Sequence, residues 1–168
     1  MRTIFLTLIL LSHHTGLISQ NPIAALNTRP LNSVYFNLLG DAALISINYD
    51  RLFILDPSFA ISGKLGIGVN KELDICIFGD CDPSITFISI PHHITCNYGQ
   101  GGHFVEFGVG GAYFLEHPTQ AYLLYPILGY RYVPLKSGKL NFRVYVHYSY
   151  KGNSSLLIPF GFSLGLGF

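Results

Sequence analysis

The sequence predicts an all-β protein: a closed, antiparallel, eight-stranded, up-and-down transmembrane β-barrel. The last eleven residues, 158–168, place a bulky apolar side chain at every second position up to Phe168. Strict alternation is the period of a β-strand, in which side chains switch faces at each residue. The composition points the same way, because hydrophobic residues make up 49% of the chain and charged residues only 11%, against about 25% in an ordinary soluble domain.

A transmembrane helix does not explain this apolar composition. After the first residues the sequence contains no run of about 18 apolar residues, which a spanning helix would require. Only helices and closed barrels satisfy the backbone hydrogen bonds inside a bilayer. A barrel distributes its apolar residues over alternate positions, so the composition favours strands that cross a membrane.

The amino-terminal residues are predicted to be a cleaved signal peptide covering 1–19. Arg2 supplies a positive charge, and a short apolar core and a polar, small-residue segment follow it. We predict cleavage after Ser19; the alternative is an amino terminus that stays anchored in the membrane. Residues 20–31 are then a periplasmic lead-in, and residues 32–168 form the barrel domain.

Eight segments of the mature chain read as strands, and turn signals rich in Gly, Asp, Pro and Ser separate them. Segments of about ten residues suit strands that are tilted in a membrane. Pro91 and Pro126 interrupt two of the segments, which predicts bulges or weakly paired stretches. The predicted strands cover residues 33–39, 43–53, 59–70, 84–97, 103–114, 122–133, 140–150 and 157–168.

Each strand has one bulky apolar face and one face of small and polar residues. The interior of an eight-stranded barrel is just wide enough for side chains to fill it, so the small, polar face is expected inside and the bulky face outside. A soluble, lipocalin-like barrel would reverse this arrangement. Its exposed face would then carry Lys, Glu and Thr in place of the Gly and Ser found here, since Gly weakens a strand.

Two acids and three bases fall on the inward face, together with Asn48, His147 and Ser149. An isolated charge in a narrow interior is very costly, so these residues are expected to pair in a ladder that plugs the lumen, with the three bases as partners of the glutamate. The predicted lumen charge network is Asp50, Lys64, Glu106, Arg131 and Arg143.

A hydrolytic site on the same inward face is a weaker hypothesis than the charge ladder. His147 and Ser149 are two residues apart and share a face with Glu106, but such combinations arise by chance in a chain of this size. Consecutive residues His92 and His93 point to opposite faces of a strand, so they do not suit one metal ion. We therefore predict no catalytic residues, no metal site and no cofactor, and we expect a protein that is not an enzyme.

The net charge of the chain argues against nucleic acid as a partner. A formal net charge of +1 provides no basic surface for nucleic acid.

Cys76 and Cys81 lie close together in an expected loop and either form a disulfide or remain thiols, and Cys96 is left over. Some of the many tyrosines in the last third of the chain are expected to form an aromatic girdle at the membrane surface.

Four short motifs carry a resemblance to a known family. They are NLLG at 37–40, SINYDR at 46–51, GYRY at 129–132 and the closing strand PFGFSLGLGF at 159–168. Together they resemble small uncharacterised outer-membrane-type β-barrel proteins of Gram-negative bacteria. The chain departs from that pattern at Asn37, where an acid is usual, and at Asp41, where a small polar residue precedes glycine. The resemblance implies the barrel fold and brings no assigned activity.

The sequence thus predicts a small barrel exported to the outer membrane, with a plugged lumen and a structural or interaction role. The alternative is a lipid-modifying barrel enzyme that acts at the outer leaflet. The expected partners are outer-membrane lipids and, during insertion, the barrel-assembly machinery. Phe168 is the expected assembly signal, because its apolar row would face lipid and meet that machinery.

Overall fold

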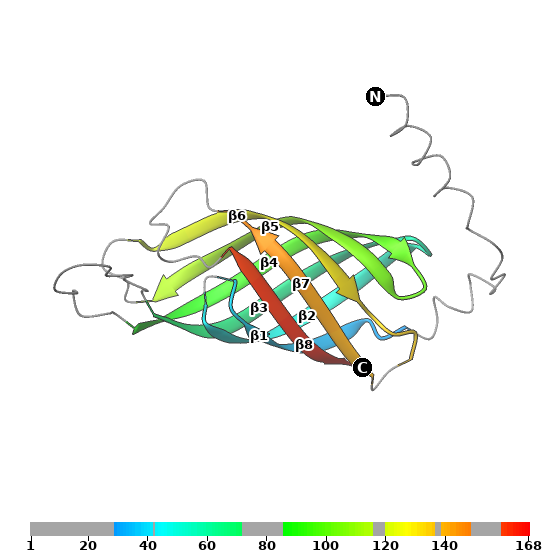
Figure 1. Ribbon diagram of the computed structural model, residues 1–168, viewed down its shortest axis with the longest axis horizontal. Helices are drawn as coiled ribbons and strands as arrows, with labels where there is room; N and C mark the ends of the chain where they lie inside the picture. The colour runs from blue at the N-terminus through cyan, green and yellow to red at the C-terminus, as the bar shows by residue number, and fades with distance from the viewer. Residues whose placement is uncertain (1–28, 42, 72–85, 116–119, 137–138, 149–158) are drawn as a thin grey trace, which may run out of the picture.

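The computed structural model describes residues 29–41, 43–71, 86–115, 120–136, 139–148 and 159–168. These residues form eight antiparallel strands in which each strand pairs with the next and β8 pairs with β1, closing a barrel (Figure 1). This confirms the predicted all-β, closed, eight-stranded, up-and-down fold. The strands are β1 (Asn32–Leu38), β2 (Ile45–Asp56), β3 (Phe59–Lys71), β4 (Thr86–Gln100), β5 (His103–Leu115), β6 (Tyr122–Tyr132), β7 (Leu140–His147) and β8 (Phe160–Gly167).

The observed strand ends lie within three residues of the predicted ones. The predicted signal peptide, residues 20–28 of the lead-in, Ser149, and Cys76 with Cys81 lie outside the described residues. Cys96 is a free thiol. The last part of the lead-in is not a free extended segment, because Arg29 and Pro30 are buried against the barrel.

The two ends of the barrel differ in their connections. We call the end where β1 begins and β8 finishes the terminus end; it lies at the right in Figure 1 and carries the β2–β3, β4–β5 and β6–β7 connections. The β4–β5 turn is a two-residue hairpin in which Gly101 and Gly102 have φ of 62° and 103°, as tight hairpins require. The opposite end, with the other four connections, is called the loop end.

Pro91 lies within β4 and Pro126 within β6, and at each of them the strand is paired with only one of its two neighbours. The β3–β4 ladder has no paired residues at Pro91, whereas pairing to β5 continues there through Ala112. β6 continues through Pro126, but its pairing with β7 begins only at Ile127. Because proline has no backbone N–H to donate, one-sided pairing is the arrangement that these positions allow.

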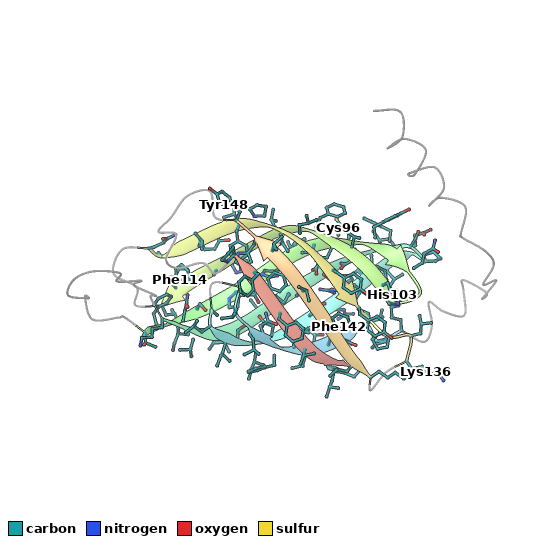
Figure 2. All side chains as sticks on the ribbon, viewed as in Figure 1. Cys96, His103, Phe114, Lys136, Phe142 and Tyr148 are labelled. Carbon is teal, nitrogen blue, oxygen red and sulfur yellow. The ribbon has the colours of Figure 1, made fainter. Side chains whose placement is uncertain are left out.

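The bulky face of every strand lies outside the barrel, as predicted. Apolar side chains project from the wall all around it (Figure 2), and Ile47, Leu65 and Ile94 are 59%, 59% and 66% exposed. The interior holds the small and polar residues but also large rings. Gly161 and Gly165 of β8 face the rings of Tyr145 and Tyr35, where an added Cβ would lie 2.5 and 2.6 Å from ring atoms. The glycine-rich inner row of β8 therefore makes room for interior aromatic side chains.

Candidate functional site: two charged clusters inside the barrel

A fully buried group of two acids and two bases lies in the interior near the terminus end. We call Asp50, Glu106, Arg131 and Arg143 the terminus-side cluster. Arg143 Nε and Nη2 donate to Glu106 Oε2 and Oε1 at 2.8 and 2.6 Å. Arg131 Nη1 and Nη2 donate to Asp50 Oδ1 and Oδ2 at 3.1 and 2.8 Å. Both contacts are two-pronged, the arrangement in which a guanidinium binds a carboxylate most strongly.

Glu106 is the centre of this cluster. Its Oε1 accepts hydrogen bonds from Arg131 Nη2 at 3.2 Å and from the Thr95 hydroxyl at 2.6 Å, in addition to Arg143. Arg131 and Arg143 are directly opposite each other in the β6–β7 ladder, so the carboxylate compensates a repulsion between neighbouring like charges. Both guanidinium groups also lie about 6 Å from the ring of Tyr35, at 6.0 and 5.9 Å, within reach of a cation–π attraction.

A second buried group lies nearer the loop end. We call Asn37, Asp41, Lys64 and His93 the loop-side cluster. Lys64 Nζ lies 2.5 Å from Asp41 Oδ2, and His93 Nε2 lies 2.8 Å from Asp41 Oδ1. The Asn37 side-chain amide also donates to Asp41, so three strands contribute groups to one carboxylate.

Asp41 reaches this position because the β1–β2 connection folds inward. Leu39, Gly40 and Asp41 have φ of 60°, 68° and 55°, a left-handed backbone that costs most non-glycine residues about 1–2 kcal/mol each. The N–H of Leu39 donates to the Leu44 carbonyl at 2.8 Å, which closes the connection. A Cβ at Gly40 would lie 2.8 Å from the Cα of Gly161. The connection therefore packs against the inner wall, and Asp41 is fully buried.

All five residues of the predicted charge network are buried inside the barrel, and four of them form the terminus-side cluster. The expected partnership of Glu106 with Lys64 is wrong, because Lys64 pairs with Asp41. Lys64 is opposite His93 in the β3–β4 ladder, and the inward connection brings the Asp41 carboxylate to both of them. Sequence reasoning missed Asp41 because Gly40-Asp41 reads only as a turn signal.

One further base was not anticipated. Arg29, just before β1, is buried and lies 4.7 Å from the centre of the Phe104 ring. It covers the interior at the terminus end, beside the first residues of β5. Its position in a segment expected to be an extended lead-in gave no sequence signal.

A hydrolytic site built from Glu106, His147 and Ser149 is not assembled in the described residues. The Glu106 carboxylate is occupied by two arginines and Thr95. His147 contacts the rings of Tyr125 and Tyr145, at 4.9 and 5.8 Å between centres, and neither of its ring nitrogens has a hydrogen-bond partner there. Ser149 lies outside the described residues.

The two adjacent histidines lie on opposite faces, as the strand period predicts. His93 is inside with Asp41, and His92 is outside, where its Nε2 lies 2.8 Å from the Tyr122 hydroxyl. Within the described ranges, no group of three or more His, Cys, Asp or Glu side chains could hold a metal ion.

No protein-family model matches this chain, and comparisons with curated proteins and with solved structures gave no match. Across the part of the chain that the structure describes, no helix is long and apolar enough to cross a membrane. The resemblance of the four motifs to a family of outer-membrane-type barrels therefore stays a prediction.

Proposed function

We propose that this protein is a small outer-membrane β-barrel with a plugged lumen and a structural or interaction role, and that it is not an enzyme. The observation that carries the proposal is the division of its two faces. Large apolar side chains cover the outside of all eight described strands, whereas acids and bases are paired inside. A soluble barrel would have the reverse arrangement.

The extent of the apolar outer face supports a lipid environment. Soluble monomers rarely expose a contiguous apolar patch larger than a few hundred Å². Here the apolar rows of neighbouring strands adjoin around the closed wall, from Val34 and Phe36 in β1 to Leu164 and Leu166 in β8. In water this apolar band would favour association of the protein with other copies, whereas in a bilayer the hydrocarbon chains of the lipids would solvate it.

Aromatic side chains flank the aliphatic band at both ends of the wall. Near the terminus end, His103, Tyr130, Tyr132 and Phe142 lie in mutual ring contact. Near the loop end, outward-facing tyrosines include Tyr113, Tyr122 and Tyr148. Figure 2 shows His103 and Phe142 toward the right-hand end, with Tyr148 to their left. Two such bands are typical of barrels that span a membrane.

The plugged lumen is supported by what fills the interior. The terminus-side cluster crosses it from β2 to β6, and the β1–β2 connection enters it from the loop end. Arg29 covers Phe104 at the other end. Eight-stranded barrels are narrow enough for side chains to fill, so we propose that this barrel conducts no ions.

The proposed location implies export by the signal peptide at 1–19, contact with outer-membrane lipids, insertion by the barrel-assembly machinery, and no nucleic-acid partner. Membrane fractionation of the expressed protein, with electrophoresis before and after boiling, tests this. We expect the protein in the outer-membrane fraction, with a gel shift on boiling. A monomer that stays soluble without detergent would contradict the proposal.

Measurements of ion conductance test the plugged lumen independently of the membrane location. Purified barrel added to a planar lipid bilayer should give no stable conductance steps, and a variant that loses the central acid, Glu106→Ala, should show more frequent brief openings. Stable steps from the parent protein would show that the lumen is open, while the membrane location would stand.

Phe168 is proposed as an assembly signal. It is 60% exposed on the outer face, and its backbone N–H and carbonyl pair with Asn32 at 2.9 and 3.2 Å, at the seam that closes the barrel. Deleting Phe168 should lower the membrane-inserted fraction, because it removes an exposed ring that the barrel-assembly machinery would contact. Export should continue, because it depends on the signal peptide. Phe168→Tyr, which keeps a terminal ring, is the matched control. Normal insertion of the deletion variant would count against this role.

A further inference from the structure

A groove of about 580 Å³ is hollowed into the outer face across β2 to β6. Its walls include Tyr49 and Phe53 of β2, Leu65 of β3, Ile94 of β4 and Leu124 of β6. The lining also includes Lys64 and His93, whose side chains are buried inside the barrel beside Asp41.

Two neighbouring rows of outward residues define the direction of the groove. One row runs through Arg51, Gly63, Ile94 and Val109, which are successive partners in the ladders from β2 to β5. The other runs through Tyr49, Leu65, His92, Gly111 and Leu124, which are successive partners from β2 to β6. Five strands spaced about 4.8 Å apart give a length of roughly 19 Å. Because membrane strands tilt by about 35–45°, the row runs diagonally and has a component along the membrane normal.

The hollow exists because two outward positions lack side chains. A Cβ built at Gly63 has no atom within 4 Å, so this position is open space. At Gly111, a Cβ would meet the Tyr122 hydroxyl at 2.1 Å and His92 Nε2 at 2.7 Å. The bare backbone at Gly111 thus seats the hydrogen-bonded His92–Tyr122 pair close to the wall, and Gly63 leaves the floor beside it empty.

The exposed cation of this lining is Arg51, since the Lys64 ammonium is buried inside the barrel beside Asp41. Arg51 is directly opposite both Gly63 and Asn32, the first residue of β1. Its guanidinium lies 5.4 Å from the Phe53 ring and makes no ion pair within the described residues. β1 begins at this level, whereas β2 continues beyond Arg51 to Asp56. A long arginine side chain can extend its charge along the wall toward the membrane surface at the terminus end.

We propose that this groove binds an anionic phospholipid of the leaflet at the terminus end, with its phosphate at Arg51 and one acyl chain along the floor at Gly63 toward Leu124. Arginine offers paired donors that suit phosphate, and the walls offer apolar contacts to a hydrocarbon chain. The His92 and Tyr122 polar groups bind each other, so the chain meets no unsatisfied donor there. This proposal rests on the membrane location proposed above.

The absence of tryptophan from the sequence makes a clean fluorescence test possible. Leu124→Trp places a single reporter in the groove, and Leu128→Trp places one on the same strand outside it; the parent leucines are 60% and 57% exposed. Both variants are reconstituted in phosphatidylcholine vesicles containing a small fraction of phosphatidylglycerol with brominated chains, which quench tryptophan on contact.

We expect the relative association constant for the brominated lipid to be about fivefold higher at the Leu124→Trp reporter, the factor that one basic residue near an anionic lipid provides. Adding Arg51→Gln or Gly63→Leu should remove this excess, and Arg51→Lys should keep most of it. Lys71→Gln, which removes an exposed lysine from the loop end of β3, should leave it unchanged. The gel shift on boiling checks that each variant folds.

Each contrary result identifies which idea fails. Equal quenching of the two reporters would overturn the lipid site while leaving the membrane location intact. An excess that survives Arg51→Gln would overturn it as well, because the phosphate contact would be wrong. If neither reporter is quenched by brominated lipid, the wall does not face lipid and the proposed function itself fails.

Discussion

The two charged clusters inside the barrel are assembled in different ways. Every member of the terminus-side cluster is an inward residue of a strand, so the strand period alone directs all four side chains to the interior. The loop-side cluster depends on Asp41, which is held by a connection with three consecutive left-handed residues. The comparison shows that one interior can contain a part fixed by the regular wall and a part fixed by an inward-folded segment.

The clusters also differ in how their charges are shared. In the terminus-side cluster, two carboxylates and two guanidinium groups interlock, so each acid contacts Arg131. In the loop-side cluster one carboxylate serves both Lys64 and His93. Losing an acid should therefore have different consequences in the two places.

The largest effect is expected from Glu106→Ala. This change leaves Arg143 without a carboxylate, because Asp50 remains to pair only with Arg131. Removing one partner of a buried ion pair typically costs about 3–5 kcal/mol. Urea unfolding in detergent micelles measures the change, with the exposed Lys136→Ala as the control. Equal midpoints for the two variants would show that the terminus-side cluster does not stabilise the barrel.

A smaller loss is expected from Asp41→Asn, about 1–3 kcal/mol, the cost of leaving a buried donor without its partner. The amide keeps the size of the side chain but removes the charge that Lys64 pairs with. Combining Asp41→Asn with Lys64→Met should recover part of the loss, because no unpaired charge then remains. A double variant less stable than Asp41→Asn alone would contradict the pairing.

Gly40→Ala tests the inward connection without touching a charge. The left-handed backbone should cost about 1–2 kcal/mol, and the contact with Gly161 adds to it. Gly101→Ala is a matched control, because Gly101 also has a positive φ but an added Cβ there meets nothing within 4 Å. The unfolding free energy should fall more for Gly40→Ala. Equal losses would show that the connection does not pack against the wall.

The smallest expected effect is the coupling between the clusters. No ion pair within the described residues joins them, although both Lys64 and Arg143 lie near the Tyr145 ring, at 5.5 and 5.2 Å. The losses in Glu106→Ala and Asp41→Asn should therefore add to within about 0.5 kcal/mol in the double variant. A larger deviation would show that Tyr145 joins the two clusters into one network.

Much of this protein could be predicted from its residues because the side-chain period of a strand is a local property. Alternation separated the side chains of each strand into two faces. The narrow interior of an eight-stranded barrel then assigned the bulky face to the outside, and Asp50, Glu106, Arg131 and Arg143 to the inside. The prolines likewise predicted where pairing would weaken, since a missing N–H acts at its own position.

What only the tertiary structure decided is which groups meet. Register places Arg131 opposite Arg143 with Glu106 beside both, and the direction of a short connection brings Asp41 to Lys64. The groove likewise requires Gly63 and Gly111, 48 positions apart in the sequence, to lie in neighbouring rows of one wall. Contacts of this kind depend on strand stagger and on the backbone of connections, and neither leaves a periodic mark in the sequence.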